Sequence, residues 1–131
     1  MSLDGYIGKS YKSILKKHFI SLEDDGYYWE LYPLFEDIFE VTGEMIDLYD
    51  GATFNSQTQI YLRKSLEKKL IDIYSKEDNW GVIVGWSFEN KKRVKVLKTV
   101  SKDKLIHLIK TIIHNLDIAK KENKKIIFLG D

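Results

Sequence analysis

The most regular feature of the chain is an alternation of large apolar residues with small or polar ones from residue 80 to residue 89. The large residues occupy every second position, at Trp80, Val82, Val84, Trp86 and Phe88. Gly81, Ile83, Gly85, Ser87 and Glu89 lie between them. A turn-like break at Glu89-Asn90-Lys91-Lys92 precedes a second alternating run through Val94, Val96 and Val100. A period of two is typical of strands, so the pattern predicts a β-hairpin.

Three longer segments repeat their apolar residues at helical spacing. The first runs from about Tyr28 to Val41 and stops at Thr42-Gly43, and Pro33 predicts a helix start within one turn of it. The second opens with a capping box at Ser56-Gln57-Thr58-Gln59 and ends near Ser75. The third is capped by Ser101 and ends among Lys120, Lys121, Asn123 and Lys124. A weaker helix is predicted upstream, around Lys9 to His18.

Two short strands complete the predicted order of elements. Met45 to Tyr49 reads as a strand that ends at Asp50-Gly51, and Ile126 to Leu129 reads as a last buried strand. The order α-α-β-α-β-β-α-β predicts a single α+β domain over residues 1–131. We expect about four strands in one mainly antiparallel sheet, with three to four helices packed on it.

The hairpin pattern also predicts how the core is packed. We expect Trp80, Val82, Val84 and Trp86 to lie on one side of their strand and to be buried. Their expected neighbours are apolar residues of the second and third helices: Leu66, Leu70, Ile109 and Ile112. A helix is expected to cover the small residues Gly81 and Gly85 on the other side, because mid-strand glycines often mark a close approach.

Composition places the chain among ordinary globular domains. It has 131 residues, of which 44% are apolar and 31% are charged. There is no cysteine, which excludes disulfides and thiolate zinc sites and suits a reducing compartment. No signal-peptide pattern and no run of eighteen apolar residues occurs, so we expect a cytoplasmic protein that does not bind membranes.

Charge divides the chain into two unlike halves. The net charge of the whole chain is +1, but residues 1–50 carry eleven acids and four lysines, a net charge of −7. Residues 51–131 carry a net charge of +8. Such a division suggests a charged interaction surface, unless the two halves mix their charges in space.

No catalytic, cofactor or metal site is predicted. His107 and His114 are seven residues apart, which is too far for a zinc pair on one helix. Asp47 and Asp50 lack the strand-borne Glu-x-Lys partners that metal-dependent nucleases use, so we interpret them as turn residues. No phosphate-binding glycine loop and no nucleophile elbow occurs. An enzyme of unrecognised type stays open as an alternative.

The predicted binding site lies in the acidic, aromatic segment from Glu23 to Tyr32 and in the helix that follows. Tyrosine and tryptophan in a charged setting are favoured anchors of protein interfaces. The predicted partner-binding residues are Glu23, Asp24, Asp25, Tyr28, Trp29, Glu30, Glu36, Asp37 and Glu40. The expected partner is another protein, and the sequence indicates no oligomeric state.

A nucleic-acid-binding surface is the alternative interpretation. It would use the cations of the hairpin together with lysines of the second helix: Lys91, Lys92, Arg93, Lys95 and Lys98 with Lys64, Lys68 and Lys69. Lysines on an exposed strand also prevent edge-to-edge pairing of sheets, and no aromatic RNA-binding motif accompanies them. Nucleic acid is therefore the less favoured partner.

Three segments resemble those of small bacterial proteins, some of which are immunity proteins that neutralise toxins delivered between competing bacteria. They are Gly43-Glu44-Met45-Ile46-Asp47-Leu48-Tyr49-Asp50-Gly51-Ala52-Thr53, Trp80-Gly81-Val82-Ile83-Val84-Gly85 and Phe128-Leu129-Gly130-Asp131. The resemblance covers roughly residues 28–131 and carries over no catalytic residue. It implies an immunity-type inhibitor that masks a cognate toxin. Many such toxins are nucleases with basic grooves, which an acidic surface would complement.

Overall fold

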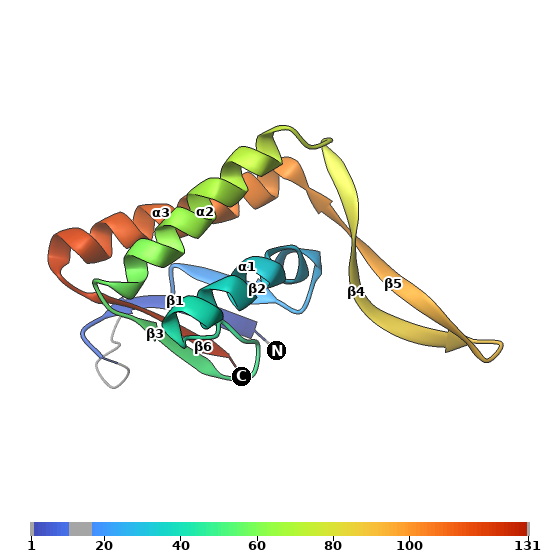
Figure 1. Cartoon of the computed structure of the whole chain (residues 1–131), viewed down its shortest axis with the longest axis horizontal. Coiled ribbons are helices and arrows are strands. Elements are labelled where there is room, and N and C mark those ends of the chain that lie inside the picture. Colours follow the sequence, from blue (N-terminus) through green and yellow to red (C-terminus); the bar gives the residue numbers. More distant parts are fainter. Residues whose placement is uncertain (1, 11–16, 131) are drawn as a thin grey trace.

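Four antiparallel strands form the larger of two sheets (Figure 1). The computed structural model describes residues 2–10 and 17–130. Strands β1 (Ser2–Gly8), β2 (Ile20–Glu23), β3 (Gly51–Phe54) and β6 (Lys125–Gly130) pair in the order β2-β1-β6-β3. The first and last strands of the chain are therefore neighbours at the centre of this sheet.

Three helices share one core with this sheet. They are α1 (Gly26–Thr42), α2 (Thr58–Tyr74) and α3 (Lys102–Glu122). Alternate sheet residues join the buried stripes of the helices in one apolar cluster, and the sheet's contributors include Leu3, Leu22, Phe54, Ile126 and Phe128. The predicted apolar stripe of α3 is confirmed, because Leu105, Ile109, Ile112 and Leu116 are all buried.

The predicted hairpin is confirmed, but it forms a second sheet of its own. Strands β4 (Asn79–Glu89) and β5 (Lys92–Ser101) pair only with each other within the described residues. They leave the body of the molecule as a long ribbon (Figure 1). Within residues 2–10 and 17–130 the fold is thus a mixture of three helices and two antiparallel sheets, in the order β-β-α-β-α-β-β-α-β. The order from α1 onward matches the prediction, whereas β1 and β2 were not predicted.

The strand predicted at Met45 to Tyr49 is wrong. These residues form a loop and a turn, and strand β3 begins only at Gly51. Ile46 and Leu48 are buried while Tyr49 is exposed. Their strand-like sequence pattern thus reflects the packing of a loop and not the pairing of strands. The loop instead lies against the end of β6, where Gly130 donates its backbone N–H to the Asp50 carbonyl at 2.8 Å.

Two details of the helix starts also differ from prediction. Asn55, not Ser56, caps α2, because its side chain accepts bonds from the backbone N–H groups of Gln57 and Thr58 at 2.9 Å each. Pro33 lies inside α1 on its exposed side, more than one turn after the helix begins. The helix starts earlier because Asp25 caps it, accepting from the backbone N–H groups of Tyr27 and Tyr28.

The helix predicted around Lys9 to His18 lies mostly outside the described residues. Among the helices that are described, none combines the length and the apolar character needed to cross a membrane.

Replacing Gly130 tests the packing of the 45–50 loop against β6. An added Cβ would lie 2.4 Å from the Leu48 carbonyl carbon and 2.5 Å from the Asp47 carbonyl oxygen, which are backbone atoms that cannot turn aside. We expect Gly130→Ala to lower the free energy of unfolding by about 1–3 kcal/mol in urea denaturation.

Gly51→Ala is the matched control, because its Cβ would meet the flexible Leu129 side chain at 3.4 Å. We expect it to change the free energy of unfolding by less than about 0.5 kcal/mol. Equal effects of the two variants would contradict the close contact between the loop and β6.

Candidate functional site

The hairpin of β4 and β5 is the most exposed element of the structure, and we call it the arm. A two-residue turn joins its strands, and both turn residues have positive φ, 49° at Asn90 and 64° at Lys91. This geometry matches the right-handed twist of paired strands. The strands of the arm are paired from its base at Asn79 and Ser101 to its tip, with one irregularity in β4.

One extra residue in β4 changes which side chains share a face of the arm. Ile83 pairs with Leu97, but the next pair is Gly85 with Val96, so Val84 is a β-bulge. Residues beyond the bulge switch faces relative to a regular strand, because side chains alternate along each strand. The strict alternation read from the sequence therefore breaks in mid-strand.

The expected burial of Trp86 beside Trp80 is wrong for this reason. Trp80 is partly buried against the main core and Val82 is buried, as predicted. The bulge carries Trp86 to the opposite face, where it joins Ile83 and Leu97. The expected helix cover is also absent among the described residues, since a Cβ built on Gly85 meets nothing there within 4 Å and one on Gly81 meets Leu97 of the paired strand.

The face opposite Trp80 forms a stripe of exposed apolar and basic side chains. Exposed fractions are 77% for Phe88, 46% for Trp86, 59% for Leu97 and 40% for Ile83. We define the arm face by the members of this stripe: Ile83, Trp86, Phe88, Arg93, Lys95 and Leu97. The Arg93 guanidinium carbon lies 3.8 Å from the centroid of the Trp86 ring, a cation–π contact between the two strands.

The base of the arm is held by α1 and α3. Val100 is fully buried, and the Ser101 backbone N–H donates to the Tyr27 hydroxyl at 3.1 Å. Lys102 donates its ammonium to the carbonyls of Tyr74 and Lys76 at 2.9 and 3.1 Å, at the end of α2. The arm is therefore anchored where it leaves the body.

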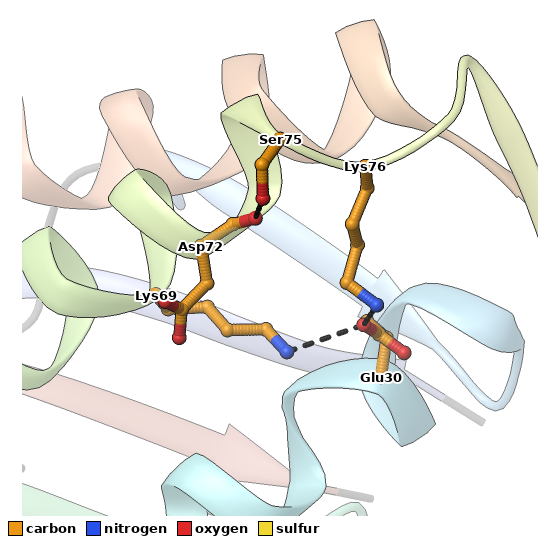
Figure 2. A network of polar contacts seen from close by, with 5 residues as sticks. All are labelled: Glu30, Lys69, Asp72, Ser75 and Lys76. Atoms are coloured by element: carbon orange, nitrogen blue, oxygen red, sulfur yellow. Dashed lines mark hydrogen bonds and ion pairs between the residues drawn. The ribbon is translucent and has the colours of Figure 1, made fainter.

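Glu30 of α1 lies close to Lys69 of α2 and to Lys76 in the segment between α2 and β4 (Figure 2). Its carboxylate lies 3.2 Å from the Lys69 ammonium and 3.9 Å from that of Lys76, and its side chain is only 13% exposed. Lys76 also lies 4.9 Å from the centroid of the Trp80 ring. Among the described residues the buried Trp80 indole N–H has no hydrogen-bond acceptor, and the Lys76 ammonium, which can only donate, contacts the face of the ring instead.

The predicted partner-binding residues do not form one surface. Tyr28 is 1% exposed and its hydroxyl donates to the Ile46 carbonyl at 3.1 Å, so it is part of the core. Burial, with a smaller effect of the Asp47 carboxylate, raises the pKa of the Tyr28 phenol above its ordinary value. Glu30 is occupied by Lys69 and Lys76 as described above.

The acids before α1 also have structural roles. Asp25 is the helix cap, and Asp24 accepts a hydrogen bond from the Trp29 indole N–H at 2.7 Å. Asp24 and Asp25 are therefore engaged in contacts within the chain. Glu23 is exposed.

The remaining predicted acids lie together on the outer side of α1. Glu36, Asp37 and Glu40 are all exposed, and their spacing of three and four residues places them on one side of the helix. None of the three forms an ion pair with any residue that the structure describes. We call these three residues the acidic face.

The histidines and turn acids show no catalytic grouping. His107 and His114 are exposed on α3, as predicted. Asp47 and Asp50 accept bonds from the backbone N–H groups of Tyr49 and Gly51, which confirms them as turn residues. Across residues 2–10 and 17–130, no group of three or more His, Asp or Glu residues could hold a metal ion.

Two surface grooves lie beside α3. One, of about 440 Å³, runs between β2 and α3, and its lining includes Phe19, Leu22, Lys104 and His107. The other, of about 560 Å³, lies between α2 and α3, where Arg63 forms ion pairs with Glu67 and Asp117.

No family model, curated protein or solved structure matches this chain.

The Glu30 network predicts a difference between two glutamates of the same helix. Glu30→Gln removes the charge that faces Lys69 and Lys76 in a mostly buried site, so we expect the free energy of unfolding to fall by about 1 kcal/mol. Glu36→Gln, at an exposed and unpaired site, should change it by less than about 0.5 kcal/mol. Urea denaturation followed by circular dichroism measures both, and an equal effect would mean that the network does not stabilise the fold.

Proposed function

We propose that this chain is a non-catalytic protein-binding module and that the arm face is its docking surface. The observation that supports this is the contiguous stripe of exposed Ile83, Trp86, Phe88 and Leu97 on an arm anchored at its base. Aromatic side chains beside arginine are the residues that most often dominate binding energy in protein interfaces. Burying such a stripe against a partner removes a large apolar area from water.

The chemistry of the arm face favours a protein over a nucleic acid. Ile83 and Leu97 form an aliphatic pair that offers neither stacking nor hydrogen bonds to a base. Trp86 already carries the Arg93 guanidinium on its ring, which occupies a surface on which a base would stack. Lys69 of the alternative basic surface is paired with Glu30. Nucleic-acid binding therefore has less support than protein binding.

The partner should present an apolar surface with acidic groups around it. Between Glu89 and Lys98 the arm carries five cations and one carboxylate, a net charge of +4. Opposite charge on the partner would speed association and fix the orientation of docking.

An immunity-type inhibitor is a narrower form of this proposal. In that form the acidic face would meet the basic groove of a toxin, and the arm would supply apolar anchors. The support for it is the sequence resemblance together with the free carboxylates of Glu36, Asp37 and Glu40.

Co-purification from native cells tests the docking surface. The variant Trp86→Ser/Phe88→Ser removes the two aromatic anchors, and because both are exposed, the fold should persist in circular dichroism. We expect affinity for the bound protein to fall by about tenfold or more, since each anchor contributes on the order of 1–2 kcal/mol.

Ile71→Ser is the control, because Ile71 on α2 is 72% exposed but lies outside the arm. It should recover the same proteins as the wild type. Recovery of the same proteins by the arm variant would reject the arm face as the docking surface.

A further inference from the structure

The acidic face and the arm face of one chain are complementary in character. Phe39 and Val41 are exposed beside the carboxylates of Glu36 and Glu40, so this part of α1 is apolar as well as acidic. The arm face combines exposed apolar residues with cations. The acidic face is therefore negative where the arm face is positive, and both surfaces have exposed apolar area that a contact could bury.

The two surfaces of the same molecule do not meet. The arm is anchored near the amino end of α1, where a Cβ on Gly26 would lie 2.7 Å from the Val100 side chain. The acidic face lies in the second half of α1, and the arm extends away from it (Figure 1). The charges of the acidic face thus stay unpaired within the described part of one chain.

We propose that the protein docked by the arm is a second copy of this chain. The arm face of each copy lies on the acidic face of the other, which forms a symmetric dimer with two identical contacts. This inference rests on the proposed function and names the partner of the same surface. A reciprocal contact of this kind closes on itself, so assembly stops at two copies.

Other ways of pairing two copies are opposed by charge. Stacking one arm face on another would bury the four apolar residues but would place Arg93 and Lys95 of both copies together. Edge-to-edge pairing of two arms would also bring two elements of charge +4 side by side. In contrast to these two arrangements, the contact between arm face and acidic face joins opposite charges.

A charge-swap experiment tests the dimer. One variant, Arg93→Glu/Lys95→Glu, changes the charge of the arm face from +2 to −2 and leaves the acidic face at −3. The other, Glu36→Lys/Glu40→Lys, changes the charge of the acidic face from −3 to +1 and leaves the arm face at +2. Two copies of the same variant would therefore place like charges together at both contacts. One copy of each variant would place opposite charges together at both contacts.

Sedimentation velocity at micromolar concentration and low salt measures the outcome. We expect wild-type dimers, monomers for each variant alone, and dimers again in the equimolar mixture. The dimer dissociation constant should rise by about tenfold or more in each single variant. Lys68→Glu is the control, because Lys68 is exposed on α2 without an ion pair to a described residue, and it should leave the dimer unchanged.

A monomeric wild type would overturn the second copy as partner. If the same protein still captured another protein through Trp86 and Phe88, the proposed function would stand without the dimer. A dimer that persisted in both charge variants would place the contact elsewhere and overturn this inference. A monomer that bound a labelled oligonucleotide through the arm, and no protein, would overturn both proposals.

Discussion

The direction of the arm depends on one close contact at its base. A hairpin of two strands is at best marginally stable by itself, because it has no third strand and no covered face. Here Val100 is buried against the start of α1, and only a glycine at position 26 leaves room for its side chain. The Tyr27 hydroxyl adds a hydrogen bond to the Ser101 backbone. Tight packing at this point fixes the arm to α1. The positions of the exposed residues farther along the arm depend on this contact.

The sequence predicted the helices and the hairpin well because their side chains carry the periodic signal. It missed β1 because the signal there is interrupted by a glycine. Leu3 and Ile7 are on the core side of the sheet, but Gly5 between them has no side chain to show the alternation. The ring of Phe19 fills that space, since a Cβ on Gly5 would lie 2.8 Å from it. The residue that completes the pattern is thus fourteen positions away in the chain.

The candidate site was less predictable for two physical reasons. A bulge is set by the pairing register of two strands, so no count along β4 alone reveals that Trp86 changes sides. The acidity of the amino-terminal half was evident, but the role of each acid was not. Asp25 caps a helix and Glu30 is held between two lysines, while Glu36 and Glu40 stay unpaired within the described residues. The cap is a local contact with Tyr27 and Tyr28, whereas the lysines that hold Glu30 are brought to it only by the folded chain.

The bulge has a consequence for how this protein could change over evolutionary time. Between Val84 and the tip, the arm packs little against the core, because Trp86, Phe88 and Leu97 are exposed. Substitutions there remove little buried area, so their cost in folding free energy should be small. Core residues do not have this freedom, because a change of even one methylene is felt in a close-packed interior. The proposed docking surface on the arm is therefore encoded largely apart from the core, and a lineage that uses it could exchange one partner for another without passing through unfolded intermediates.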